Sequence, residues 1–148
     1  MTRAGLIEKI ARAIAEMEGF YATAAKPTLA QRNANPGNIR QWRDARGRQY
    51  PTSKGYVDFV AWASERFPAL SRDELSRRAL DEGWRILRVL VGQYLDGRYT
   101  QGKPPTAEEM FRVYAPSADG NHPAHYARFV ASKIGARPDQ RLLDLVTA

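Results

Sequence analysis

The sequence predicts an α+β protein that is predominantly α. Apolar residues recur at three- and four-residue spacing in the first eighteen positions and again after Ser71, as on one face of a helix. Between these regions, turn-forming residues alternate with short extended runs, which favours a small β-hairpin and loop segment. A chain of 148 residues has the usual size of one domain, so we expect a single domain over residues 1–148.

The first predicted helix runs from about Thr2 to Glu18. Gly19 is the expected stop, because glycine readily takes the left-handed conformation after a last helical turn. The apolar face of this helix is made by Leu6, Ile7, Ile10, Ala11, Ala13, Ile14 and Met17. Glu18 falls at the edge of this face, so it is the carboxylate of this helix that lies nearest to apolar side chains.

The position of Glu18 has a chemical consequence. A carboxylate in the last turn faces the negative end of the helix dipole, and apolar neighbours add a desolvation cost. Both effects predict a raised pKa, which suits a general acid in glycoside cleavage. The alternative is a partly solvated glutamate at a frayed helix end.

The middle of the chain combines turn chemistry with short extended segments. The segment 32–40 (RNANPGNIR) is rich in asparagine, proline and glycine, which predicts a tight loop. Residues 43–50 suggest a small hairpin around Gly47. Residues 56–62 are apolar and aromatic, and we expect them to be extended first and helical afterwards.

A long helix is predicted after a capping box at Ser71-Arg72-Asp73-Glu74, in which serine and glutamate can satisfy each other's free amides. The helix continues through Trp84 to Tyr94, either unbroken or broken near Asp81. Core packing is the expected role of Trp62 and Trp84. The stretch 63–79 has no assigned role.

The last third of the sequence predicts a loop over 97–105 and then three short helices. A second capping box at Thr106-Ala107-Glu108-Glu109 begins the first of them. Pro123 favours the start of the second, and Gly135 its end. Asp139 is the expected cap of the third.

The composition limits which kinds of site the chain can carry and whether it can insert into a membrane. The absence of cysteine excludes disulfides and thiolate metal sites. His122 and His125 are three residues apart, but spacing places no third ligand near them, so we expect no metal and no other cofactor. The sequence has no secretory signal and no apolar run of membrane-spanning length, which predicts no membrane insertion.

The net charge of +7 suits a polyanionic partner, either peptidoglycan or nucleic acid. The arginines are scattered rather than aligned on one helix face, and no helix-turn-helix or zinc-finger spacing occurs. We therefore expect no nucleic acid partner.

Six segments, in order and over nearly the whole chain, resemble the lysozyme-like proteins of bacteriophages and prophages. That family is related to goose-type lysozymes and soluble lytic transglycosylases. The segments are Glu18-Gly19-Phe20, residues 32–40, residues 55–59 (GYVDF), residues 81–87 (DEGWRIL), residues 106–116 (TAEEMFRVYAP) and residues 126–130 (YARFV). The resemblance implies a lysozyme-like fold, in which a small β-hairpin and loop form a wall beside a helical bundle.

The resemblance also implies site residues. Glu18 matches the catalytic acid of the family, and the loop 32–40 matches one wall of the sugar cleft. Tyr114 matches, more loosely, the tyrosine of an "AYNAG"-like segment that faces the acid, although this chain has Val-Tyr-Ala-Pro there. Trp42 follows the cleft wall and either lines the groove or packs on the surface. The expected substrate-binding residues are Asn35, Gly37, Asn38, Arg40, Trp42, Tyr114 and Tyr21.

The mechanism depends on whether a second carboxylate takes part. A hydrolase needs one as a base or nucleophile, and Asp44 and Asp58 are the two candidates. A lytic transglycosylase needs only one acid/base, because the 6-hydroxyl of the sugar attacks and closes an anhydro ring. We expect Glu18 to act first as acid and then as base, with either water or the 6-hydroxyl as acceptor.

The expected function is therefore cleavage of the β-1,4 bond between N-acetylmuramic acid and N-acetylglucosamine, as a muramidase or lytic transglycosylase. The protein would act as a monomer on peptidoglycan glycan strands, as a phage endolysin or a virion-associated enzyme. Without a signal peptide it would stay in the host cytoplasm before release to the cell wall, or travel in the virion. The alternatives are a non-catalytic wall-binding or virion structural module on the same fold and a basic nucleic-acid-binding protein.

Overall fold

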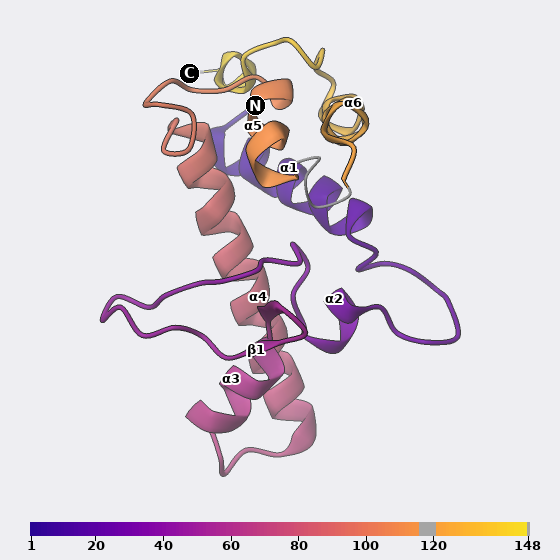
Figure 1. Ribbon diagram of the computed structural model, residues 1–148, viewed down its shortest axis with the longest axis vertical. Helices are drawn as coiled ribbons and strands as arrows, with labels where there is room; N and C mark the ends of the chain where they lie inside the picture. Colours follow the sequence, from indigo (N-terminus) through magenta and orange to yellow (C-terminus); the bar gives the residue numbers. More distant parts are fainter. Residues whose placement is uncertain (116–120, 148) are drawn as a thin grey trace. The chain divides into compact units, whose positions relative to one another are not determined.

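The computed structural model describes residues 1–115 and 121–147, and it is mostly helical with a small antiparallel sheet (Figure 1). This confirms the predominantly α, α+β class. Pro116, the last residue of one segment of the resemblance, lies outside the described residues. The elements are α1 (Arg3–Met17), α2 (Leu29–Arg32), β1 (Thr52–Ser53), β2 (Tyr56–Val57), α3 (Phe59–Arg66), α4 (Arg72–Leu95), α5 (Ala107–Tyr114), α6 (Pro123–Ile134) and a 3-10 helix (Leu142–Leu145).

The chain divides into two compact units. The first unit consists of Met1–Ala13 and Arg88–Ala148, and the second unit consists of Ile14–Leu87. Helices α1 and α4 are each divided, with one part in the first unit and the other part in the second unit. The first unit is thus assembled from both ends of the sequence, and the second unit is continuous.

The core of the first unit is apolar and helical. Its fully buried side chains include Leu6, Ile10, Val91, Leu95, Met110, Phe111, Val130 and Leu142. Helix α5 packs on α6 through stacked rings of Phe111 and Tyr126, whose centroids are 4.6 Å apart. The capping box predicted at Thr106 is present, and α6 begins at Pro123 and ends before a left-handed Gly135, so these three predictions are confirmed.

The last helix differs from the prediction. It is a 3-10 helix that begins after Arg141 and has no side-chain cap. Asp139 instead accepts a hydrogen bond from Nε of Arg137 at 3.2 Å. The prediction of Asp139 as the cap was wrong, because the N-cap position is Arg141, two residues after the aspartate.

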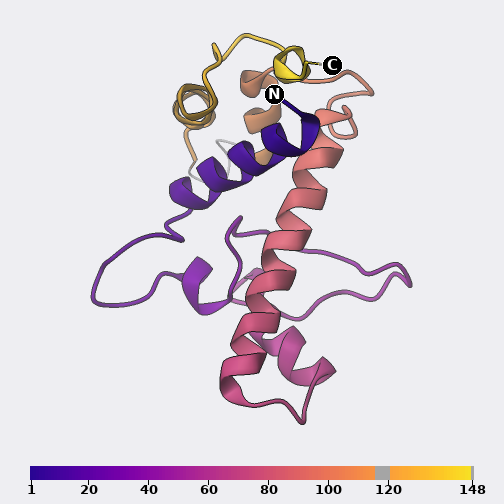
Figure 2. The same ribbon diagram turned by 180° about the vertical axis from the view of Figure 1, so that it is seen from behind.

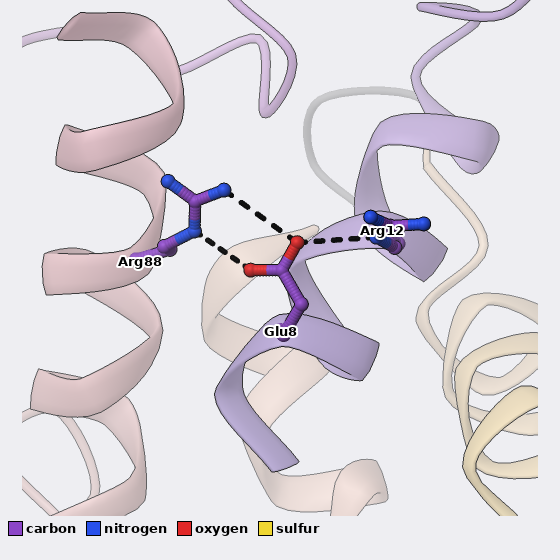
Figure 3. A network of polar contacts seen from close by, with 3 residues as sticks. All are labelled: Glu8, Arg12 and Arg88. Atoms are coloured by element: carbon purple, nitrogen blue, oxygen red, sulfur yellow. Dashed lines mark hydrogen bonds and ion pairs between the residues drawn. The ribbon is translucent and has the colours of Figure 1, made fainter. Parts of the chain in front are cut away.

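An ion-pair network in the first unit joins α1 to the C-terminal part of α4 (Figure 3). Glu8 accepts hydrogen bonds from Nε of Arg88 at 2.7 Å and from Nε of Arg12 at 3.1 Å. The hydrogen bond from Arg88 is the main cause of the lowered pKa of Glu8. Since the three side chains are partly exposed, the network contributes little to stability.

The second unit carries the irregular part of the chain. A bridge between Arg43 and Gln49 pairs the arms of the predicted hairpin, and the amide of Gly47 donates to the carbonyl of Asp44 at its turn. Strands β1 and β2 pair in antiparallel register, Thr52 with Val57 and Ser53 with Tyr56. The hairpin and the extended-then-helical segment 56–62 are both confirmed.

Helix α4 is 24 residues long. Both views show it as a single uninterrupted helix (Figures 1 and 2). The amide of Glu74 donates to Oγ of Ser71, so the predicted helix start is confirmed. The alternative of a break near Asp81 was wrong. The helix continues because Ala79, Ile86 and Leu87 bury one continuous apolar face against the second unit's core.

A buried polar network braces the second unit. Glu82 on α4, only 8% exposed, accepts from the hydroxyl of Tyr50 at 2.6 Å and from Nε and a terminal nitrogen of Arg85 at 2.6 and 3.0 Å. Burial acts to raise the pKa of Glu82, but the hydrogen bonds from Arg85 and Tyr50 outweigh it, and the pKa is lowered. Burial and this carboxylate together raise the pKa of Tyr50 to about 12.

Removal of the Glu82 carboxylate should destabilise the protein. Glu82→Ala leaves the Tyr50 hydroxyl buried without its acceptor and Arg85 without its carboxylate, which should lower the free energy of unfolding by about 2–4 kcal/mol. Urea denaturation followed by circular dichroism measures this change. Asp81→Ala, at the exposed neighbouring position, is the control and should change stability by less than about 0.5 kcal/mol. Equal effects of the two substitutions would contradict a structural role of the network.

The same network predicts a pH dependence. Because the folded-state pKa of Glu82 lies below its ordinary value of 4.5, its stabilisation is fully present above about pH 4.5 and is lost as pH falls through the folded value. The stability difference between wild type and Glu82→Ala should therefore be constant from pH 7 to 5 and shrink at lower pH. Urea midpoints measured across this range test it, and a difference that grows on acidification would refute it.

Candidate active site at the Glu18 turn

Glu18 is the last residue of the helical ladder of α1. Its amide donates to the carbonyl of Ile14 at 2.9 Å. Gly19 follows with φ 77°, while the amides of Gly19 and Phe20 donate to the carbonyls of Glu16 and Ala15. These two bonds form a Schellman motif, which ends the helix as predicted. The motif fixes the backbone on both sides of Glu18, whose side chain is half-buried.

Helix α2 anchors the segment that follows Glu18. Thr28 and Gln31 form a capping box, and both side chains also bond to the Glu18 turn. Oγ1 of Thr28 donates to the carbonyl of Gly19 at 3.1 Å, and Nε2 of Gln31 donates to those of Phe20 and Ala22 at 3.0 and 2.7 Å. The sequence analysis missed this capping box, although the threonine and glutamine three residues apart are the usual signal.

The loop 33–40 is organised by one buried side chain. Asn35 is fully buried, and its Nδ2 donates to the carbonyls of Ile39 and Val57, both at 3.0 Å. Its Oδ1 accepts from the amide of Ile39 at 3.0 Å. The predicted contact of Asn35 with substrate is therefore corrected, because its side chain is buried, with two bonds that close the loop on Ile39 and one that joins the loop to Val57 of β2. Gly37 is buried in the same loop.

The loop also holds strained backbone and unsatisfied polar atoms. Ala34 and Asn38 have φ of 50° and 49°, in the left-handed region that costs a residue with a side chain about 1–2 kcal/mol. Nδ2 of Asn33 and Oδ1 of Asn38 are buried without a hydrogen-bond partner in the described part of the chain. Strain and unmet hydrogen bonds in one short loop are typical of a functional site.

Helix α4 reaches this loop at a glycine. A Cβ on Gly83 would lie 2.1 Å from the carbonyl oxygen of Ala34 and 3.0 Å from Cδ of Pro36, so only glycine fits. The next residue, Trp84, packs against Phe20 edge to face, with centroids 5.6 Å apart. Three separate segments of the sequence therefore meet in the second unit: the Glu18 turn, the loop 33–40 and Gly83-Trp84.

Among the other predicted binding residues, three are accessible in the second unit. Arg40 is exposed and its guanidinium lies 5.3 Å from the ring centroid of Tyr56. Trp42 is half-exposed, and its carbonyl accepts from the amide of Tyr50 at 2.9 Å. Tyr21 is 52% exposed beside Phe20. These side chains are open to a ligand.

Tyr114 has a different setting, in the first unit. Its ring packs against those of Tyr94, Phe111 and Tyr126, with centroids 5.7 to 6.1 Å apart. This aromatic cluster gives Tyr114 a packing role that the resemblance did not imply.

Both candidates for a second carboxylate hold local structure. Oδ1 of Asp44 accepts from the amides of Arg46 and Arg48, each at 2.9 Å, and Oδ2 pairs with Nε of Arg48 at 3.4 Å. The backbone hydrogen bond from Arg48 is the main cause of the lowered pKa of Asp44. Oδ1 of Asp58 accepts from the amides of Val60 and Ala61 and caps α3.

None of the protein families, curated proteins or solved structures compared with the chain matches it. Over residues 1–115 and 121–147, no three acidic or histidine side chains are grouped to hold a metal ion. No helix within those residues has the length and apolar character to cross a bilayer.

The close approach at Gly83 gives a sharp test of this assembly. Gly83→Ala should force the loop 33–40 away from α4 and destabilise the protein by about 1–3 kcal/mol or more. Gly92→Ala in the same helix is the matched control, because its Cβ would meet no atom closer than 3.6 Å. That change should stabilise the helix by about 0.5–1 kcal/mol. Thermal denaturation compares the two, and a neutral Gly83→Ala would show that the loop does not depend on the contact.

Proposed function

We propose that this protein cleaves peptidoglycan glycan strands at the β-1,4 bond between N-acetylmuramic acid and N-acetylglucosamine, with Glu18 as the acid. One observation carries the proposal. Three of the segments that resemble phage lysozyme-like proteins contact one another, although the contacting residues are up to 64 positions apart. The contacts are those of Phe20 with Trp84 and of Gly83 with the loop 33–40. A lysozyme-like fold accounts for this convergence.

The setting of Glu18 supports a role as general acid. It lies at the C-terminal end of α1, where the helix dipole disfavours negative charge on a carboxyl group. Its backbone is held on one side by the Schellman motif and on the other by Thr28 and Gln31. A catalytic group held this firmly keeps its orientation toward a bound sugar, which is where much of the rate gain of an enzyme arises.

The settings of Asp44 and Asp58 favour a mechanism with one carboxylate. Each accepts two backbone amide hydrogen bonds and maintains a turn or a helix start. We therefore propose a lytic transglycosylase reaction. Glu18 protonates the glycosidic oxygen as the bond from C1 to that oxygen breaks. The resulting carboxylate then takes the proton of the 6-hydroxyl, whose oxygen attacks C1 and closes the 1,6-anhydro ring.

The open side chains suggest how a glycan would be held. Arg40 and Trp42 follow the strained loop, and Tyr21 follows the Glu18 turn. Aromatic faces pack on sugar rings, and arginine binds the carboxylates of the peptide stems. Such a protein would act as a phage endolysin or as a virion-associated enzyme.

A non-catalytic wall-binding module is the second candidate. The observation that favours it is the packing of Tyr114 in an aromatic cluster, without the asparagine and glycine that follow the tyrosine in related enzymes. This candidate predicts binding to the cell wall without any new glycan end.

Analysis of the muropeptides released from purified peptidoglycan tests these proposals. Wild type should release fragments with anhydromuramic ends, and Glu18→Gln should slow this release by a factor of about 10² to 10⁴. Glu16→Gln, an exposed position in the last turn of α1, is the control and should retain activity close to that of wild type. Circular dichroism establishes that both variants are folded.

Each outcome distinguishes the proposals. Reducing sugar ends in place of anhydro ends would make water the acceptor and refute the single-carboxylate mechanism. Equal activity of wild type and Glu18→Gln would exclude Glu18 as the acid. Wall binding without product, on peptidoglycan of several chemical types, would favour the non-catalytic module.

A further inference from the structure

A basic pocket in the second unit lies outside the residues proposed for glycan cleavage. Its volume is about 480 Å³, and the 44–50 hairpin, α3 and α4 line it. Its charged residues are Arg46, Arg48, Arg66, Arg85, Asp44 and Glu82. Arginines thus outnumber carboxylates by four to two, and no residue of the Glu18 turn or of the loop 33–40 lines the pocket.

The two carboxylates of the pocket are already satisfied. Glu82 is held by Arg85 through two hydrogen bonds and by Tyr50 through a third. Asp44 is held by two backbone amides and by the side chain of Arg48. Both negative charges are therefore balanced within the pocket.

Two guanidinium groups remain without such a partner. In the part of the chain that the structure describes, neither Arg46 nor Arg66 forms an ion pair or a side-chain hydrogen bond. They come from different segments, Arg46 from the hairpin turn and Arg66 from the last turn of α3. Arg66 interacts with Glu82 through charge alone, without a hydrogen bond. With four guanidinium groups against two carboxylates, the pocket keeps an excess of positive charge that attracts an anion.

One wall of the pocket is aromatic and closely packed. The rings of Tyr50 and Trp62 are stacked, with centroids 5.8 Å apart and planes 3° from parallel, and Phe67 meets Trp62 edge to face. The Tyr50 hydroxyl is fixed by Glu82, which ties this stack to α4. The packed rings keep this wall in place, so its ordering costs little entropy when an anion binds.

We propose that this pocket binds the phosphate group of a ligand, with Arg46 and Arg66 as the contacting residues. A carboxylate has two oxygens in one plane, and a single arginine can satisfy both. A phosphate has three or four oxygens in a tetrahedral arrangement, which can accept from guanidinium groups that approach from separate segments. Arg85 and Arg48 line the same pocket and add to its positive potential, although Arg85 is paired with Glu82 and Arg48 with Asp44.

Nuclear magnetic resonance titration with inorganic phosphate tests the site. The indole N–H resonance of Trp62, assigned by comparison with Trp62→Phe, reports on the pocket at pH 7.5 and constant ionic strength. It should shift to saturation in wild type. Arg46→Gln with Arg66→Gln should weaken binding at least tenfold, and both side chains are exposed, so the fold should persist. The matched control, Arg72→Gln with Arg77→Gln, removes the same charge from exposed positions of α4 in the same unit and should bind as wild type does.

Further probes identify the source of the phosphate. Dimethyl phosphate stands for a phosphodiester in a polymer, and glutarate stands for a dicarboxylate. Saturation by phosphate and dimethyl phosphate indicates a phosphodiester ligand, and saturation by phosphate alone indicates a terminal phosphate. Saturation by glutarate but not by phosphate would overturn the assignment. No specific shift, or equal weakening in both double variants, would overturn the site itself.

If the double variant does not fold, the single variants Arg46→Gln and Arg66→Gln replace it, and each should weaken phosphate binding severalfold. Unchanged binding in both would refute the proposal. The result is independent of glycan cleavage, because Glu18→Gln should bind phosphate as wild type does.

Discussion

The contact between Gly83 and the carbonyl of Ala34 is the constraint on which the second unit depends. A helix and a loop can approach this closely only where no side chain intervenes. This close contact places Trp84 against Phe20. It also lets Tyr50, at the end of the hairpin, donate its hydroxyl hydrogen bond to Glu82. Because Gly83 has no Cβ, helix α4 can pack against both the Glu18 turn and the loop 33–40 that follows it.

Two buried polar side chains complete this arrangement, each in a different manner. Asn35 uses donor and acceptor together to close its own loop and to join it to β2. Glu82 gathers a tyrosine and an arginine from separate positions around one carboxylate. The bonds of Asn35 close the loop in which Ala34 and Asn38 adopt positive φ. Two of the positive-φ residues of the second unit and two unsatisfied polar atoms therefore lie in the loop 33–40.

The features that the sequence predicted well are those determined by neighbouring residues. The extent of α1, the glycine stops at Gly19 and Gly135, and the capping box at Thr106 all follow from interactions within one helical turn. The burial of Asn35 depends on Val57, 22 residues away, and the position of Tyr50 depends on Glu82, 32 residues away, which no local pattern reveals. The roles expected for Asp44 and Asp58 came from their residue type, whereas their backbone amide partners are apparent only in the fold.

The division of the sequence between the two units has a consequence for how the chain is made. The second unit is one continuous segment that ends at Leu87, so a ribosome synthesises all of it before α5 and α6. The first unit joins residues 1–13 to residues 88–148, and its core cannot assemble until α5 and α6 have emerged. During translation the apolar face of α1 therefore stays exposed until α5 and α6 have been made, and chaperones that bind nascent chains can reach it. The second unit, which carries the proposed sites, is therefore complete in the nascent chain before the first unit is.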